Sequence, residues 1–313
     1  MRVIRLRKIG VALGAGLALA SCVPTSAPVD SPRPEQRYET STAPSAESQA
    51  YAAYYRSIEA RLVGQGRLRT DGGTTDAPVG PRTLATNFER IALFDEYQLR
   101  DGRFVAQQTP SRLRRWTSPV RVQSHFGPSI PAQRQSADNA VLSTYASRLA
   151  RVTGHPIRAV RSGGNFHVLY LNRDELRGIG SYVRQLVPGI GDATVIQMEN
   201  MPRSTFCAVF AFSESGSNTA YVNAIAIIRD EHPDLLRRSC VHEEVAQGLG
   251  LPNDSPAARP SIFNDDEEFA LLTPHDEALL RMLYDPRLRV GMEPADARPV
   301  VQALASQYAG GPS

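Results

Sequence analysis

A helical segment that ends at a glycine constrains the fold of this chain most. Residues 234–250, DLLRRSCVHEEVAQGLG, place apolar residues at helical spacing and stop at Gly250. Two apolar stretches precede it, FCAVFAF at 206–212 and VNAIAIIRD at 222–230, and both are typical of buried strands. The segment therefore predicts strands followed directly by a helix, as in a domain with a mixed α and β core.

The segments before these strands extend the same pattern. RRWTSPVRVQSHFG alternates apolar and polar residues around Val120 and Val122, which predicts a strand. ADNAVLSTYASRLARVTG predicts an amphipathic helix of about four turns that closes at Gly154. NFHVLYLNR, at 165–173, predicts another strand. The order strand, helix, strand, strands, helix predicts one α+β domain over residues 110–313.

The first 21 residues predict export. MRVIRLRK is basic, and IGVALGAGLALA is apolar but too short to span a bilayer as a resident helix. The run Leu19-Ala20-Ser21-Cys22 resembles a bacterial lipobox, which implies a signal peptide over 1–21, cleavage before Cys22 and acylation of that cysteine. A plain secretory signal followed by a chance cysteine is the alternative.

The predicted lipid anchor implies a membrane partner and a location in the cell envelope. Acylated Cys22 would attach the chain to a lipid membrane of the bacterial cell envelope. Val23 follows it instead of an aspartate, so by resemblance to enterobacterial sorting rules we expect the outer membrane, facing the periplasm. Loss of the four basic residues of the leader would lower the formal net charge from +3 to −1. The charge therefore indicates no nucleic-acid partner.

Besides the predicted acylated Cys22, two cysteines remain in the exported part, Cys207 and Cys240. An exported protein meets oxidising conditions, so this pair predicts one disulfide. Closing a loop of about 30 residues would stabilise the fold by roughly 3 kcal/mol. Two free buried cysteines are the alternative.

The composition divides the remaining N-terminal part into two segments, residues 22–49 and residues 50–109. Residues 22–49 are rich in Pro, Ser, Thr and Ala, which predicts a disordered tether. Residues 50–109 form a predicted N-terminal helical extension, with helical patterns at 47–63 and 84–98 that could form a small cap on the main domain.

The helix at 234–250 resembles the metal-binding helix of metzincin peptidases, H-E-x-x-H-x-x-G-x-x-H. The frame fits but the ligand residues differ. The positions that match it are Glu243 and Gln247 for two histidines, Glu244 for the general base, Gly250 for the turn, and Asn253 with Asp254 beside it for the third ligand. Downstream, SIFND resembles the metzincin Met-turn with Phe263 in place of methionine.

The chain also resembles DUF2927, a family of uncharacterised proteobacterial proteins that are often lipoproteins. The resemblance rests on RWTSPVRV, EEVAQGLGLPND, SIFND and LLRMLYDPRLRVGM and covers roughly residues 60–295. Together the two resemblances imply a zincin-like α+β fold: a twisted mixed sheet with a motif-bearing helix and a C-terminal helix.

The ligand set argues against a working zinc centre. Zinc is held by thiolates, imidazoles and carboxylates, and here only Glu243 is a good ligand. Gln247 and Asn253 offer amide oxygens, which suit calcium better. We therefore expect no cofactor, with zinc or calcium as the open alternatives, and a polar network in which Gln247 bonds to Glu243 and Asn253 fastens the returning loop. None of the histidines forms a pair at i, i+4.

Three functions are compatible with this reading. The first is an envelope-anchored lipoprotein whose inactive zincin-like domain binds a peptide or protein against an edge strand. The second is a metallopeptidase that uses oxygen ligands and Glu244 as its general base. The third is a structural envelope lipoprotein.

Overall fold

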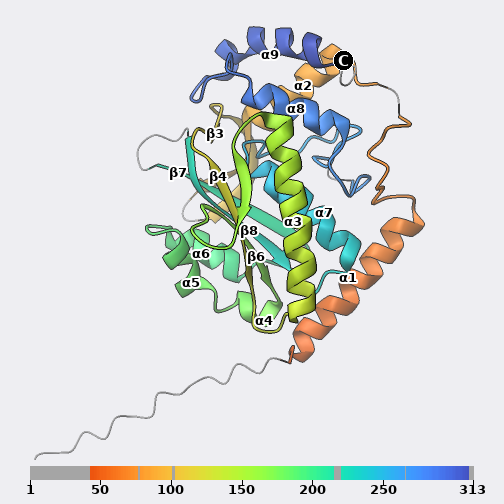
Figure 1. The fold of residues 1–313 in the computed structure, drawn as a ribbon, viewed down its shortest axis with the longest axis vertical. Coiled ribbons are helices and arrows are strands. Elements are labelled where there is room, and N and C mark those ends of the chain that lie inside the picture. Colours follow the sequence, from red (N-terminus) through yellow and green to blue (C-terminus); the bar gives the residue numbers. More distant parts are fainter. Residues whose placement is uncertain (1–42, 77, 101–102, 215–219, 265, 310–313) are drawn as a thin grey trace, which may run out of the picture. The chain divides into compact units, whose positions relative to one another are not determined.

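The structure is a computed structural model that describes residues 43–76, 78–100, 103–214, 220–264 and 266–309 (Figure 1). The predicted signal peptide, the predicted lipidation site Cys22 and most of the predicted tether lie outside the described residues. Within the described ranges, no helix combines the length and apolar character needed to cross a bilayer.

The described residues combine helices with a sheet of mostly parallel strands, which confirms the predicted α+β class. The helices are α1 (Ala46–Gly64), α2 (Pro81–Ala92), α3 (Ala132–Thr153), α4 (Arg173–Leu176), α5 (Gly180–Leu186), α6 (Asp192–Glu199), α7 (Asp234–Gln247), α8 (Pro274–Tyr284) and α9 (Pro294–Tyr308). The strands are β1 (Phe94–Arg100), β2 (Arg103–Pro110), β3 (Arg115–Trp116), β4 (Val120–Phe126), β5 (Ile157–Val160), β6 (Phe166–Leu171), β7 (Cys207–Ser213) and β8 (Ala220–Arg229).

The main sheet is mixed, and β7 lies at its edge. Strands β3, β8, β6, β4 and β5 are parallel to their neighbours in that order. β7 pairs antiparallel with β8, with Cys207 opposite Ile228. Tyr221 of β8 has Trp116 on one side and Ser213 on the other, so β3 and β7 flank β8 on opposite sides. Among the described strands, β7 pairs only with β8.

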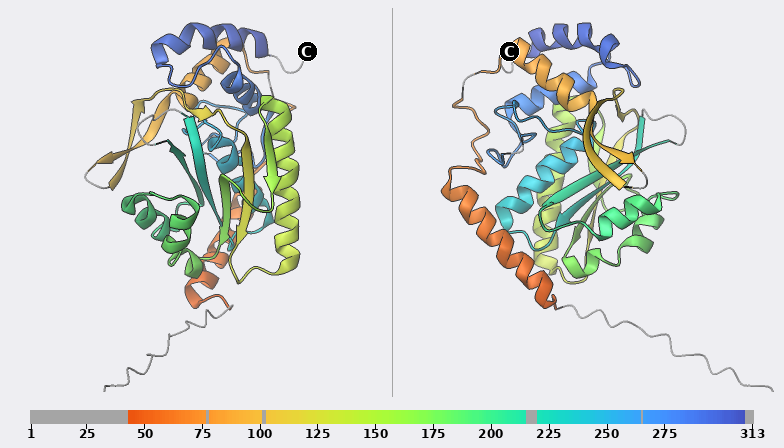
Figure 2. Two further views of the ribbon diagram at one scale, coloured as in Figure 1. Left: turned by 60° about the vertical axis from the view of Figure 1, so that its left-hand side comes forward. Right: turned by 180° about the vertical axis from the view of Figure 1, so that it is seen from behind.

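Helices cover both faces of this sheet, as the left-hand view of Figure 2 shows. On β6, Phe166, Val168 and Tyr170 belong to the large core that also contains residues of α2, α3, α7, α8 and α9. Leu169 and Leu171 belong to a second core with residues of α5 and α6. Because both faces of β6 are buried, its sequence is apolar at every position except His167 rather than alternating.

The N-terminal part differs from the prediction in one place. The helical pattern at 84–98 continues only to Ala92, and Phe94 begins the antiparallel hairpin β1–β2. Leu84, Phe88 and Ile91 of α2 belong to the large core, so this helix shares the core of the main domain. The helix ends where β1 begins to pair with β2, and helical spacing in the sequence does not indicate this pairing.

The predicted helix that closes at Gly154 is longer than expected. It begins at Ala132, and Gly154 follows it with a φ of 66°. This left-handed position satisfies the end of the helix without a side-chain clash, which is why glycine closes it.

Candidate functional site

Glycines set the position of α7 against the sheet. A Cβ at Gly248 would lie 2.5 Å from the Phe166 ring, so the end of the helix contacts β6 closely. Gly250 has a φ of 129°, and a Cβ there would lie 2.3 Å from the carbonyl oxygen of Arg114. The Trp116 indole donates to the Gly248 carbonyl over 2.8 Å. These contacts fix the turn after α7 beside β3.

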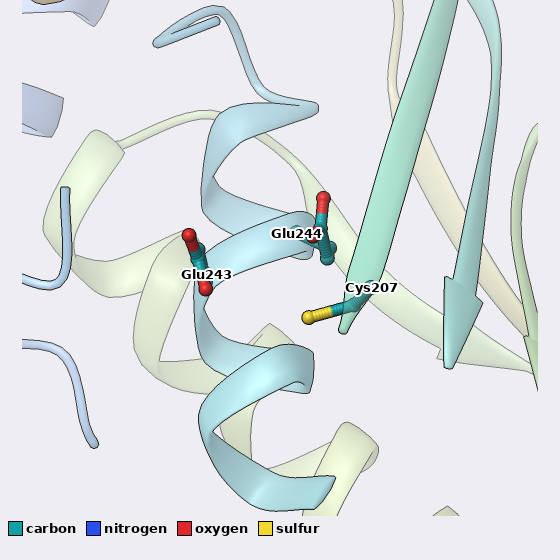
Figure 3. Close-up of side chains that lie close together, drawn as sticks. All are labelled: Cys207, Glu243 and Glu244. Atoms are coloured by element: carbon teal, nitrogen blue, oxygen red, sulfur yellow. The ribbon is translucent and has the colours of Figure 1, made fainter. Parts of the chain in front are cut away.

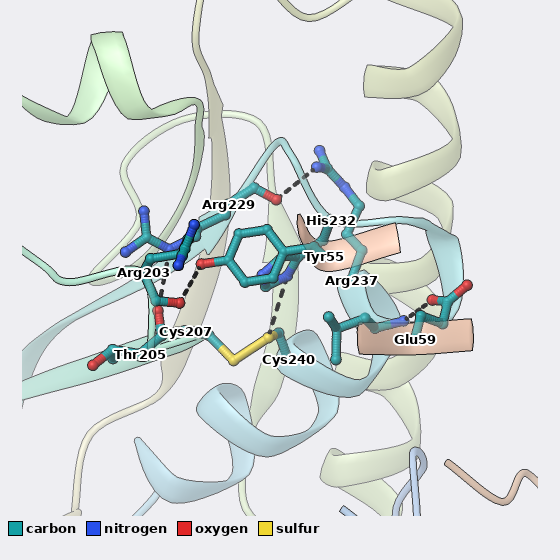
Figure 4. The surroundings of a disulfide bond; sticks show 10 residues. Tyr55, Glu59, Arg203, Thr205, Cys207, Arg229, His232, Arg237 and Cys240 are labelled. Carbon is teal, nitrogen blue, oxygen red and sulfur yellow. Dashed lines mark hydrogen bonds between the residues drawn. A yellow bond between two sulfur atoms is a disulfide. The ribbon is translucent and has the colours of Figure 1, made fainter. Parts of the chain in front are cut away.

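The predicted disulfide is present and joins α7 to the edge strand. Cys207, the first residue of β7, is bonded to Cys240 of α7 (Figure 4). Tyr55 of α1 and His232 pack beside the bond, with their ring centroids 4.4 Å apart. His232 Nδ1 lies 3.6 Å from the sulfur of Cys240. The disulfide therefore ties β7 to α7 where the candidate cleft begins.

A cleft of about 560 Å³ runs between the edge strand and α7. Five consecutive β7 residues, 207–211, line it, so the strand itself forms one wall. The polar side chains of the other walls are Asp95, Arg114, Gln197, Thr205, Glu243, Glu244, Gln247 and Asp254. The sequence analysis predicted Glu243, Glu244, Gln247 and Asp254 as site positions, and the structure brings these four together.

The cleft is acidic. Four carboxylates line it, and one guanidinium, that of Arg114, faces them, so the formal charge of the lining is −3. Arg114 forms an ion pair with Asp95, which lies in β1. Sequence reasoning missed both residues because neither carries a motif: Asp95 lies in the predicted N-terminal extension, and Arg114 is the first residue of the RRWTSPV strand pattern. Glu244 is only 4% exposed, whereas Glu243 is half-buried.

The polar network around the motif includes an acceptor that the sequence analysis did not name. The Gln247 amide donates to Asp254 Oδ1 over 3.0 Å. Asn253 is 1% exposed, and its amide donates to the Arg90 carbonyl of α2 over 2.9 Å. Asn253 thus fastens the returning loop, as expected, and is not among the residues that line the cleft.

The turn that contains Phe263 supports this loop from the other side. Phe263 is fully buried, and its carbonyl accepts from the Ser255 amide over 2.9 Å. The Ser261 hydroxyl accepts from the Phe263 amide and donates to Asp276 of α8 over 2.5 Å. Burial raises the pKa of Asp276. The loop after α7 is therefore held on both sides by hydrogen bonds to main-chain carbonyls, those of Arg90 and Phe263.

The site does not fit a zinc ion with conventional ligands. Cys207, Glu243 and Glu244 each offer an atom within 4.8 Å of the others (Figure 3). The sulfur of Cys207 is bonded to Cys240 and cannot act as a thiolate. Two carboxylates remain, without an imidazole, and calcium would require about six to eight oxygens. We therefore derive no chemical step through a metal at this position.

His242, which precedes the motif glutamates, points away from the cleft. Its ring stacks on Tyr145 at 4.0 Å, and its Nδ1 accepts from the Leu272 amide over 3.1 Å. Burial lowers the pKa of His242 to about 3. It is a packing residue and is not among the residues that line the cleft.

Comparison with known proteins identifies a family. No curated protein matches the chain. The family model described as "Protein of unknown function (DUF2927)" matches residues 81–303, which include β3, the cleft helix α7 and the turn at Phe263. The chain belongs to this family.

Proposed function

We propose that this chain is an envelope-anchored lipoprotein whose cleft binds an extended peptide segment with basic side chains. The observation that carries the proposal is the course of β7, whose residues 207–211 form a wall of the cleft. An edge strand offers a row of main-chain groups to a further strand, and peptides are commonly bound this way.

Charge complementarity favours a basic segment. Glu243, Glu244 and Asp254 stand on the wall opposite the edge strand, and the Asp95–Arg114 ion pair adds no net charge. A peptide lying against β7 would pass these carboxylates with every second side chain directed to one face. An arginine or lysine there would gain charge-assisted hydrogen bonds.

The zincin-like relationship remains part of the proposal. A parallel sheet with one antiparallel edge strand, and a helix with the metzincin frame beside that edge, support it. The ligand chemistry favours binding over hydrolysis, since no imidazole stands where the motif requires two. A peptidase would have to activate water with Glu244 and oxygen ligands alone.

A displayed library of random nonapeptides, panned on the purified protein, tests the binding. We expect enriched sequences with arginine or lysine near the centre and no proline there, because proline removes a donor from the added strand. Panning that enriches no sequence would contradict the proposal. Cleavage of peptides that a chelator abolishes would establish the metallopeptidase instead.

Matched variants locate the site. With an enriched peptide, Glu243→Gln combined with Glu244→Gln should weaken binding about tenfold, corresponding to about 1.4 kcal/mol, and reduce its dependence on salt. Asp234→Asn serves as control, since this carboxylate lies at the far end of α7 and is 96% exposed. Equal affinity in both variants would place the peptide elsewhere.

The anchor has its own test. Metabolic labelling with an alkyne fatty acid should mark the chain, and Cys22→Ser should abolish both the label and sedimentation with outer membranes. Ser21→Ala keeps a small residue before the cysteine and should leave both unchanged. Labelling that survives Cys22→Ser would contradict the predicted lipidation.

A further inference from the structure

Two histidines meet on the face of the sheet opposite α7. His125 of β4 and His167 of β6 come from neighbouring parallel strands. His125 Nε2 lies 3.0 Å from His167 Nδ1, and the ring centroids are 5.1 Å apart. The other nitrogen of His125, Nδ1, lies 2.7 Å from the hydroxyl of Tyr182 in α5. The sequence analysis considered these histidines only singly, because 42 residues separate them.

Both rings are neutral at neutral pH. Burial lowers the pKa of each to about 4, and for His167 the neighbouring His125 adds to this effect. No carboxylate or guanidinium among the described residues contributes to either shift. Neutral imidazole is the form that binds transition metals, so both rings are ready ligands without losing a bound proton to solution.

The distance between the two nitrogens is close to that required by one metal ion. Metal–nitrogen bonds of about 2.0–2.1 Å at a tetrahedral angle separate two ligand nitrogens by roughly 3.3 Å. The observed separation is 3.0 Å. An increase of a few tenths of an ångström, with each ring rotated by roughly 35° so that both lone pairs point at one ion, would convert the hydrogen-bonded pair into a pair of ligands.

We propose that His125 Nε2 and His167 Nδ1 bind one divalent transition-metal ion, with the Tyr182 oxygen accepting a hydrogen bond from His125 Nδ1–H. A second-shell acceptor of this kind fixes the tautomer of a ligating histidine and leaves its other nitrogen directed at the metal. In the unliganded pair one hydrogen lies between the two rings. On binding, that hydrogen moves to the other nitrogen of the ring that carries it, His125 Nδ1 or His167 Nε2, so the total proton count is unchanged.

The site is open. Tyr182 is 39% exposed and His125 half-buried, whereas His167 is 4% exposed. Two protein nitrogens leave the remaining coordination positions to water or to an external ligand. Cu²⁺ should bind most tightly among the divalent first-row ions, with Zn²⁺ weaker. The site lies on the face of the sheet opposite α7 and shares no lining residue with the acidic cleft, so it does not depend on the function proposed for that cleft.

Titration of the purified full chain with Cu²⁺, followed by electron paramagnetic resonance, tests the proposal. We expect one tightly bound ion whose hyperfine pattern reports two nitrogens. His125→Gln and His167→Gln should each weaken binding at least tenfold and leave one nitrogen, and Tyr182→Phe should weaken it by up to about tenfold with both nitrogens kept. His155→Gln, a half-buried histidine that contacts the Ser118 carbonyl, is the control and should change nothing.

Retention of full affinity and of two nitrogens in His167→Gln would overturn the proposal. If a variant fails to fold, the protein without substitutions still tests the proposal. In nuclear magnetic resonance, the imidazole nitrogen signals of two histidines should shift together as Zn²⁺ is added. Shifts at other histidines, with these two unmoved, would equally overturn it.

Discussion

Replacement of Gly250 by alanine should destabilise the protein far more than the same change at Gly154. Both glycines follow a helix and both have a positive φ, 129° at Gly250 and 66° at Gly154. Their surroundings differ. A Cβ at Gly154 would meet nothing within 4 Å, whereas one at Gly250 would lie 2.3 Å from the Arg114 carbonyl oxygen.

The expected loss of unfolding free energy follows from the backbone conformation at each glycine and from the contacts of the added Cβ. At Gly154 alanine bears only the left-handed backbone penalty, about 1–2 kcal/mol. At Gly250 the backbone lies further from the region that other residues adopt, which costs about 1–3 kcal/mol. Displacing the Arg114 carbonyl adds about 1–3 kcal/mol, as for other overpacked sites. We expect Gly250→Ala to lose about 4 kcal/mol of unfolding free energy, against about 1 kcal/mol for Gly154→Ala.

Urea denaturation followed by the fluorescence of Trp116 measures both variants. This is the single tryptophan of the chain, it is buried, and it bonds to the Gly248 carbonyl beside the turn. The midpoint should fall much further for Gly250→Ala, at similar slope. Equal losses in the two variants would refute the argument that close approach of β3 to the turn requires glycine.

Two further predictions concern stability. Replacing Cys207 and Cys240 together by serine should lower the unfolding free energy by roughly 3–4 kcal/mol, because the bond closes a loop between residues 33 positions apart; a loss below about 1 kcal/mol in urea denaturation would contradict this. His242 has a folded pKa of about 3, below its unfolded value of about 6.5, so the unfolded chain binds the extra proton first. Stability should be independent of this group above pH 6.5 and fall by up to about 1.4 kcal/mol per pH unit below it, and His242→Gln should flatten that fall in acid titrations.

The sequence predicts well those elements whose signal is local. β4, β6, β7, β8 and α7 appear where apolar runs and helical spacing predict them, and the disulfide joins the two cysteines that the sequence analysis paired. The hairpin β1–β2 was missed because the helical spacing at 84–98 continues into residues that pair with a strand further along the chain. The spacing of apolar residues at 84–98 does not indicate that β1 pairs with β2.

The sequence predicted which residues lie near the site better than it predicted which of their side chains line the cleft. Asn253 and Asp254 are adjacent, yet only Asp254 lines the cleft, because the Asn253 amide is taken by the Arg90 carbonyl of α2. That contact joins residues 163 positions apart. The meeting of His125 and His167 has the same origin, since it depends on which strands become neighbours.

Hydrogen exchange of the β7 amides tests the central claim, that an extended peptide adds to this edge strand. Alternate main-chain amides of an edge strand point outward and exchange readily, whereas those bonded to the inner strand are protected. With a basic peptide selected by panning, the outward amides within 207–213 should exchange at least tenfold more slowly, and β5 at the opposite edge should be unchanged. Saturating peptide that leaves every β7 amide exchanging at its original rate would contradict the account.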